Sequence, residues 1–287
     1  MLPTFDEIYA RVDKGSRRSL QSFRRDHSLK RLQVGNTAWQ YVTVGQGEQA
    51  ILFLHGMAGA YDIWWQQITD LWTDYRVLSV TYPISDGLED LERGILALLD
   101  HEGVSQISLV GSSLGGYLAQ YLVARYPGRV ETAILANTFP PNDLIASKNR
   151  VTARLLPFLP EGLVRRILRQ NVEKSIYPAS GYSELVRAYL LEQYSRPGCK
   201  ARFLFGYRCV TTPFDAPDLE AAQVPALVLE ADNDPLVGKS LREMLKGTYP
   251  TARVHAFHQA GHFPYLNEPD AYTKIIEGFL DVGGTSG

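Results

Sequence analysis

The chain has 287 residues, of which 45% are hydrophobic and 21% charged, a composition that argues against disorder and allows a large core. The formal net charge of −2 gives no electrostatic reason to expect nucleic acid as a partner. The two cysteines, Cys199 and Cys209, are too few for a disulfide framework or a four-cysteine zinc site.

The N-terminal segment carries acidic residues and no apolar region typical of a secretory signal, and no apolar run approaches the roughly 20 residues that cross a bilayer. We therefore expect a cytoplasmic protein with reduced thiols and no stable membrane insertion. The charge is uneven, with +4 over residues 1–31, +6 over residues 140–217 and −12 over the remainder. The basic N-terminal stretch has two interpretations, a weak peripheral contact with an anionic membrane and a solvated helix packed on the domain.

Strands and helices alternate through most of the chain. Strands are expected at residues 30–34, 39–44, 50–54, 76–82, 106–110, 130–136, 225–229 and 253–257. Helices are expected at residues 88–99, 114–126, 238–245 and 269–280. This alternation predicts an α/β fold with a mostly parallel central sheet that is flanked by helices on both faces.

Residues 140–217 interrupt the alternation with few strand-like runs and helical patterns at 155–168 and 184–194. A helical insertion between two strands of a parallel sheet lies over the edge where such folds bind ligands. We therefore predict a helical cap inserted after the sixth strand, at residues 140–217. The core then comprises residues 30–139 and 218–282, preceded by a basic helical leader at 1–29 and followed by a flexible tail at 283–287.

The pentapeptide Gly111–Gly115 fits the pattern G-x-S-x-G between an expected strand and an expected helix. In that context a sharp turn exposes the central side chain, and glycines two residues away on either side leave room for it. The spacing selects Ser113 over Ser112 as a nucleophile. A glycine-rich turn with incidental serines is the alternative interpretation.

A serine hydroxyl is a weak nucleophile and needs a histidine base that a carboxylate orients. His262 lies just past the last expected strand, and both Asp232 and Asp234 follow the strand at 225–229. Serine, acid and histidine therefore all follow strands at the same edge of the predicted sheet. No group of residues has metal-ligand spacing and no dinucleotide or phosphate-binding loop is present, so we expect no metal and no cofactor.

Four segments in this order, LFLHGMAG, VGSSLGG, ADNDPLV and AGHFPYLNEPDAY, resemble the α/β-hydrolase superfamily across about residues 30–282. Within it, DIWWQQI, YRVLSVTYPI, SLGGYLAQ, AILANTF and TYPTARVHAF are similar to maspardin-like proteins. The resemblance implies the α/β-hydrolase fold and the catalytic order Ser113, Asp234, His262, with the acid placed directly before Pro235. It also implies that the N–H groups of Met57 and Leu114 form an oxyanion hole, while His55 braces the loop.

Aromatic side chains beside these motifs are candidates for the wall of an acyl pocket, and packing between cap and core is the alternative for each. We name Trp64, Phe139 and Phe263 as candidate substrate-binding residues. A serine at the nucleophile position disfavours the dehalogenases and epoxide hydrolases of this fold, which use a carboxylate.

The sequence thus favours a serine hydrolase that cleaves a carboxylic ester of a small-molecule acyl substrate through an acyl-enzyme intermediate. One alternative is a non-catalytic binding or adaptor protein, which the resemblance to maspardin-like proteins suggests and which the presence of His262 opposes. Another is a triad enzyme that acts on a thioester, amide, lactone or carbon–carbon bond. The sequence does not specify the oligomeric state.

Overall fold

The computed structural model describes residues 3–283 and contains a single eight-stranded sheet. The strands are β1 (Lys30–Val34), β2 (Thr37–Val44), β3 (Ala50–Leu54), β4 (Arg76–Thr81), β5 (Ile107–Ser112), β6 (Val130–Ala136), β7 (Ala226–Ala231) and β8 (Arg253–Phe257). Their spatial order is β1-β2-β4-β3-β5-β6-β7-β8. The β1–β2 and β2–β4 pairs are antiparallel and all other pairs are parallel. The predicted mostly parallel sheet is therefore confirmed.

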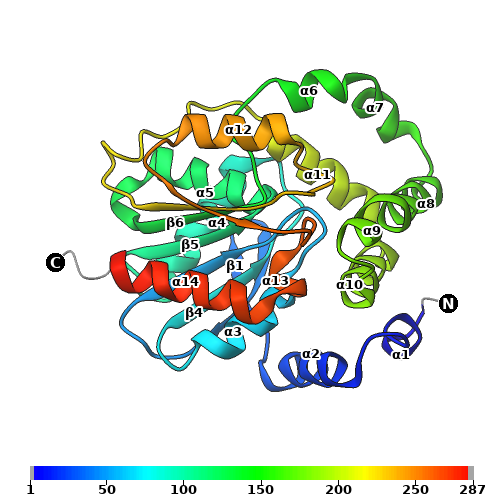
Figure 1. Ribbon diagram of the computed structural model, residues 1–287, viewed down its shortest axis with the longest axis horizontal. Coiled ribbons are helices and arrows are strands. Elements are labelled where there is room, and N and C mark those ends of the chain that lie inside the picture. The colour runs from blue at the N-terminus through cyan, green and yellow to red at the C-terminus, as the bar shows by residue number, and fades with distance from the viewer. Residues whose placement is uncertain (1–2, 284–287) are drawn as a thin grey trace.

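Helices cover both faces of the sheet, with α5 and α12 on one side and α3 and α14 on the other (Figure 1). These core helices are α3 (Trp65–Leu71), α4 (Leu88–His101), α5 (Leu114–Arg125), α12 (Lys239–Thr248), α13 (Pro264–Asn267) and α14 (Pro269–Gly283). Successive strand residues point to opposite faces, so Leu52 and Leu54 join one hydrophobic cluster while Ile51 and Phe53 join the other. Burial on both faces explains why β3 is apolar throughout, and β5 is likewise buried along its whole length.

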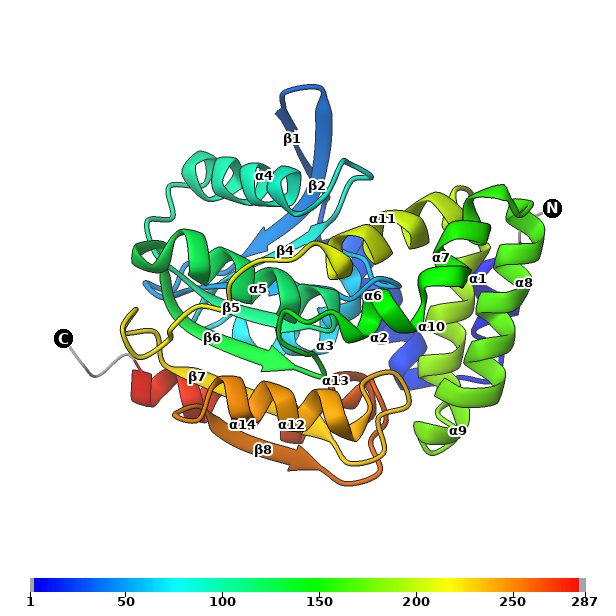
Figure 2. The ribbon, with the colours of Figure 1, turned by 90° about the horizontal axis from the view of Figure 1, so that it is seen from above.

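The segment between β6 and β7 contains helices and no strand, and it sits at one end of the sheet (Figure 2). Its principal helices are α6 (Leu144–Lys148), α7 (Arg150–Leu155), α8 (Glu161–Asn171), α9 (Tyr177–Ala179), α10 (Glu184–Ser195) and α11 (Cys199–Thr211). The predicted insertion of a helical cap after the sixth strand is confirmed. Both cysteines lie on α11, where they are buried and free.

One predicted helix, at residues 155–168, is wrong as a continuous element. Helix α7 ends at Leu155, a 3₁₀ turn spans Leu156–Phe158, and α8 begins only at Glu161. Pro157 and Pro160 cause the break, because proline lacks an amide hydrogen and restricts the residue before it. Helices α3 and α11 lie outside the predicted elements, since α3 has only seven residues and the apolar residues of α11 do not follow a single clear stripe.

The basic leader forms α1 (Phe5–Ile8) and α2 (Lys14–Asp26), and α2 packs on the domain through Leu20 and Phe23. Arg24 of α2 donates to the buried carboxylate of Asp62 in the core at 2.6 Å and to Glu192 of α10 at 2.8 Å. The leader therefore ties the core to the cap. Part of its basic charge is paired within the protein and is not presented to a partner.

The predicted flexible tail at residues 283–287 lies outside the described residues, apart from Gly283, at which α14 ends. Among residues 3–283, no helix is long and apolar enough to cross a membrane.

Candidate active site

Ser113 lies at the turn between β5 and α5 and has φ 55° and ψ −118°, a conformation that L-residues rarely adopt. The turn is held on both sides, since Ser113 N–H donates to Ala136 O at 2.9 Å and Thr138 Oγ1 donates to Ser113 O at 2.7 Å. Backbone strain of this kind costs of order 1–3 kcal/mol and persists where the surroundings fix it. The Ser113 side chain consequently stands at the carboxyl edge of the sheet, half-buried and accessible from the cavity described below.

Glycine is required on both sides of this turn. A Cβ atom on Gly111 would lie 2.3 Å from Gly115 O, and one on Gly115 would lie 2.0 Å from the backbone oxygen of Leu54. Both contacts are with backbone, which cannot move aside as a flexible side chain can. The motif spacing therefore has a steric cause, the close packing of α5 against β5 and β3.

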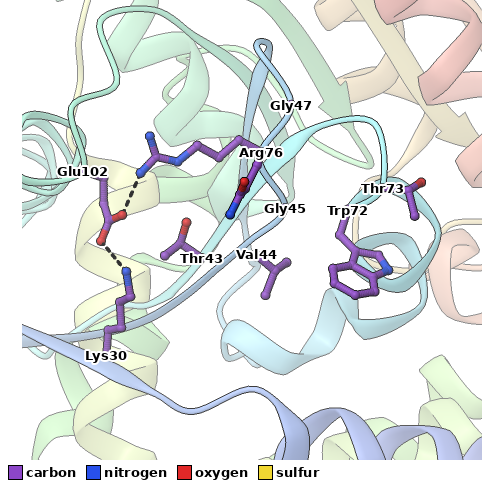
Figure 3. A pocket seen from close by; sticks show the side chains of 10 residues that line it. Lys30, Thr43, Val44, Gly45, Gly47, Trp72, Thr73, Arg76 and Glu102 are labelled. Carbon is purple, nitrogen blue, oxygen red and sulfur yellow. Dashed lines mark hydrogen bonds and ion pairs between the residues drawn. The ribbon is translucent and has the colours of Figure 1, made fainter.

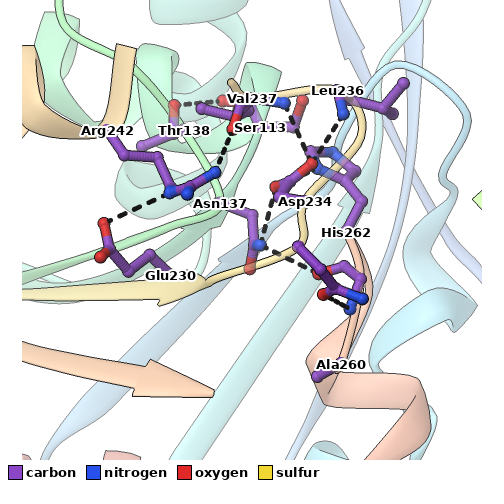
Figure 4. Close-up of polar contacts among 12 residues, drawn as sticks. Ser113, Asn137, Thr138, Glu230, Asp234, Leu236, Val237, Arg242, Ala260 and His262 are labelled. Carbon is purple, nitrogen blue, oxygen red and sulfur yellow. Dashed lines mark hydrogen bonds and ion pairs between the residues drawn. The ribbon is translucent and has the colours of Figure 1, made fainter. Parts of the chain in front are cut away.

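The carboxylate of Asp234 follows β7 and accepts four hydrogen bonds. Its Oδ2 accepts from His262 Nδ1 at 2.8 Å and from Asn137 Nδ2 at 2.9 Å. Its Oδ1 accepts from the backbone N–H groups of Leu236 at 2.8 Å and Val237 at 3.0 Å (Figure 4). Every acceptor position is thus filled by a donor, and the carboxylate fixes which nitrogen of the imidazole carries a proton.

Burial and hydrogen bonding act in opposite directions on this acid. The Asp234 side chain is fully buried, and burial by itself raises the pKa of its carboxyl. The interactions with His262, with the Asn137 amide and with the Val237 N–H outweigh burial and hold the pKa of Asp234 below its ordinary value. The carboxylate therefore stays ionised beside an imidazole that is itself only 3% exposed.

The loop that carries Asp234 is held by Arg242 of α12. Its guanidinium donates to Val237 O at 2.8 Å (Figure 4). It also donates to Asp232 O at 3.0 Å. The competing acid, Asp232, points elsewhere. Its carboxylate accepts from Gln259 N–H at 2.8 Å and pairs with the exposed ring of His258. Of the two candidate acids, the structure brings only Asp234 to His262.

Asn137 is a site residue that sequence reasoning missed. It directly follows β6, has φ 44°, and directs its buried amide at Asp234 and at Gly261 O, which is 3.4 Å away. Asparagine adopts this left-handed conformation more readily than most residues. Its available signal was a polar residue placed immediately after the apolar second half of β6, residues 133–136.

Ser113 and His262 line the same cavity, yet no hydrogen bond joins Ser113 Oγ to the imidazole among the described residues. Bonds between nucleophile and base are often long in unliganded enzymes and shorten when substrate binds. The structure thus contains a paired acid and histidine with a serine beside them, and the proton path from the serine is not yet closed.

The loop after β3 lies against the nucleophile. A Cβ on Gly56 would lie 3.2 Å from Ser113 Cβ, and among the described contacts the N–H groups of Met57 and Leu114 have no acceptor. Leu114 is the first residue of α5, where helix geometry leaves the amide free and the helix dipole favours negative charge. The two amides predicted to form an oxyanion hole therefore remain available as donors.

His55 braces this loop and takes no part in the acid–histidine pair. Its Nε2 accepts from Tyr82 N–H at 3.3 Å, so Nδ1 carries the hydrogen and donates to Gly56 O at 2.6 Å. The ring also stacks on Tyr82 with centroids 3.9 Å apart. Complete burial lowers the pKa of His55 to about 4, which keeps the ring neutral at pH 7.

A cavity of about 690 Å³ extends between core and cap from Ser113 and His262. Its walls are largely apolar and come from both parts of the chain, among them Ile63, Leu168, Ile176, Phe203, Val210 and Leu241. Lys148 is the one formally charged side chain among its described lining residues other than the histidine. The cavity therefore suits a mostly apolar ligand with few ionic groups.

Two of the three predicted substrate-binding residues, Phe139 and Phe263, line this cavity. Trp64 does not, and this placement corrects the expectation. Its ring is fully buried in the core against Phe53 and Tyr265, with centroids 5.0 and 4.1 Å apart. The neighbouring residue, Ile63, reaches the cavity instead, because the 3₁₀ turn at Tyr61–Trp64 directs successive side chains differently.

A second depression lies at the opposite edge of the sheet, where β3 and β4 begin (Figure 3). Its charged residues are paired with one another, since Lys30 and Arg76 both donate to Glu102, at 3.0 and 2.8 Å. It holds no nucleophile beside a base. Among residues 3–283, no group of three or more potential ligands is arranged to hold a metal ion.

Comparisons with known proteins agree with this arrangement. A family model described as "Alpha/beta hydrolase family" matches residues 51–275. Maspardin of Danio rerio is 26% identical over 221 residues, which cover 75% of this chain and 69% of the relative. A 2-hydroxy-6-oxononadienedioate/2-hydroxy-6-oxononatrienedioate hydrolase of Burkholderia vietnamiensis is 26% identical over 261 residues, covering 84% and 90%. The solved enol-lactonase from Burkholderia xenovorans matches with a TM-score of 0.74 and 21% identity over 88% of this chain and 100% of that chain, and so shares the fold.

Proposed function

Because the chain belongs to the alpha/beta hydrolase family, we propose that it is a serine hydrolase that cleaves a carboxylic ester with an apolar acyl group. The observation that carries the proposal is the Asp234–His262 pair. A fully buried carboxylate orients the imidazole in the same cavity that Ser113 lines. A histidine with a purely structural role does not require a place in a cavity wall, next to a serine in a strained backbone conformation.

The chemistry follows from these positions. Ser113 Oγ attacks the ester carbonyl carbon while His262 Nε2 accepts the serine proton. Asp234 holds the Nδ1–H tautomer and stabilises the imidazolium that forms. The amides of Met57 and Leu114 donate to the oxyanion, and such donors are worth about 3–4 kcal/mol of barrier. His262 then protonates the leaving alcohol and later activates the water that releases the acid from Ser113.

The cavity supports the choice of substrate. One formal cation, Lys148, stands among its described lining residues, so a single carboxylate would find a partner and a second would not. The Burkholderia vietnamiensis relative is named for dioate substrates, which carry two carboxylates. We therefore favour neutral acyl esters over such dianions for this chain, with thioesters, amides, lactones and carbon–carbon bonds as the other reactions open to the same triad.

A panel of p-nitrophenyl esters of increasing acyl chain length tests this proposal, with Ser113→Ala as the matched control. We expect turnover that Ser113→Ala abolishes, with kcat/KM rising with chain length until the acyl group fills the cavity. Turnover that persists in Ser113→Ala contradicts the mechanism, and a preference for acetyl esters contradicts the acyl pocket.

A binding protein without turnover is the second candidate, and two observations favour it. Maspardin is among the relatives, and Ser113 and His262 are not hydrogen-bonded in the structure. If the ester panel shows no turnover while a long-chain fatty acid still binds in the cavity, this second function is supported in place of the first.

A further inference from the structure

The outer surface of the cap between α6 and α8 exposes an unusual set of large apolar side chains. Four exposed apolar residues fall within thirteen residues of the chain, namely Leu155, Phe158, Leu163 and Ile167. Phe158 is the most exposed of them, at 85%. Leu163 and Ile167 are one turn apart on α8, on the exposed side next to the buried stripe of Val164 and Leu168. Clusters of exposed apolar groups mark interaction surfaces more often than scattered single residues do.

Basic residues alternate with these apolar residues along the same stretch of the chain. Lys148, Arg154, Arg166 and Arg169 are exposed and form no ion pair with any residue that the structure describes. Arg165, Arg166 and Arg169 line a shallow depression of about 350 Å³ on α8, in which only Arg165 is paired, with Glu161. We call these apolar and basic side chains together the outer cap face. The helices that carry it, α6, α7 and α8, run along the periphery of the molecule (Figure 1).

The uneven charge of the molecule favours one orientation of this face on an anionic surface. Residues 144–171 contain six basic residues and one acidic residue, whereas the chain outside residues 1–31 and 140–217 carries −12. An anionic surface attracts the outer cap face and repels the core. The basic leader is a weaker candidate, because Arg11, Arg17 and Arg24 are each paired with a carboxylate of this chain.

We propose that the outer cap face docks this protein on an anionic lipid bilayer, with Phe158 and its apolar neighbours in the headgroup region and the unpaired arginines on lipid phosphates and carboxylates. Exposed Phe and Leu side chains interleaved with Arg are the composition of surfaces that lie in a membrane interface. The arginine-lined depression offers a place for an anionic headgroup, and each basic residue near such a surface contributes about a fivefold increase in partitioning.

Docking in this orientation brings the bilayer close to the cavity. Leu144 and Lys148 line the cavity and are exposed, so the cavity reaches the surface beside α6, next to the outer cap face. A lipid-borne acyl group therefore has a short path to Ser113. The docking itself does not depend on catalysis, and it is measured separately from turnover.

The test is co-sedimentation of the full chain with vesicles of phosphatidylcholine alone and of phosphatidylcholine with phosphatidylserine. We expect binding to the phosphatidylserine vesicles that weakens as salt is raised, and little binding to phosphatidylcholine. The double variant Arg166→Gln/Arg169→Gln should lower the partition coefficient about thirtyfold. Phe158→Ser should lower it about tenfold.

Matched controls carry the same substitutions elsewhere. Arg18→Gln/Arg31→Gln removes two exposed arginines outside the cap, and Ile84→Ser removes an exposed apolar side chain of the core. Both should bind as the wild type does, and Ser113→Ala should as well, which separates docking from the proposed hydrolysis. The proposal is overturned if the wild type stays in the supernatant, in which case a protein partner takes this surface. It is also overturned if the control variants lose binding as much as the cap variants.

Discussion

Replacement of Asp234 by asparagine separates the structural role of this side chain from its role in catalysis. The Asn Oδ1 can still accept from the Leu236 and Val237 amides, so the loop keeps its shape. At the other position an NH₂ group replaces an acceptor and now faces two donors, His262 Nδ1–H and the amide of Asn137.

The imidazole of His262 can relieve this conflict by carrying its hydrogen on Nε2 in place of Nδ1. A protonated Nε2 can no longer accept the serine proton. We therefore expect kcat of Asp234→Asn on the preferred ester to fall about 10⁴-fold, as a wrong tautomer costs in serine enzymes. Because the substitution leaves the buried amide of Asn137 without its acceptor, we expect the free energy of unfolding to fall by about 1–3 kcal/mol.

The assay is steady-state ester hydrolysis combined with urea unfolding, and Asp232→Asn is the matched control. Asp232 contacts His258 and Gln259 near the surface and no atom of the acid–histidine pair, so its variant should keep kcat within about twofold. The reasoning is refuted if Asp234→Asn keeps kcat within about tenfold of the wild type, or if Asp232→Asn loses activity equally.

Three further outcomes follow from the packing. Gly115→Ala places its Cβ 2.0 Å from a backbone oxygen, so the free energy of unfolding should fall by about 3 kcal/mol or more, whereas Gly128→Ala, with open space around it, should be near neutral in the same urea titration. The pKa of His55 is lowered to about 4 by burial, so the unfolded chain binds the extra proton first as pH falls below 6.5. Stability should drop by up to about 3 kcal/mol between pH 6.5 and 4, and a His55→Gln variant whose stability declines equally over that range would contradict this cause. Arg24→Ala leaves two carboxylates without their shared cation and should cost about 3 kcal/mol, while Arg25→Ala on the exposed side of the same helix should stay within about 0.5 kcal/mol by thermal unfolding.

The sheet and the turn at Ser113 could be predicted because local signals and tertiary packing agree there. Buried parallel strands such as β3 must be apolar on both faces, and the Gly111–Gly115 spacing reports a steric requirement that the structure shows directly. The order of the motifs also identified the family correctly, as the match over residues 51–275 confirms.

The remaining features depend on contacts between distant parts of the chain. An aromatic residue after the β3 loop is compatible with both a pocket and a core, and only packing against Tyr265 places Trp64 in the core. In the sequence, Arg24 does not differ from the other arginines of the leader. Its role depends on Asp62 of the core and Glu192 of the cap, which only the fold brings next to it. Asn137 lies 97 residues from Asp234 in sequence, so no local pattern could pair them.

The central claim is that Ser113 is a nucleophile that His262 activates. Incubation with a fluorophosphonate followed by intact-mass analysis tests it most directly, because the reagent bonds only to an activated serine. We predict one adduct on the wild type, located at Ser113 by peptide mapping, and none on Ser113→Ala or His262→Ala. A wild type that remains unmodified, or a Ser113→Ala variant that is labelled to the same extent, would contradict the account.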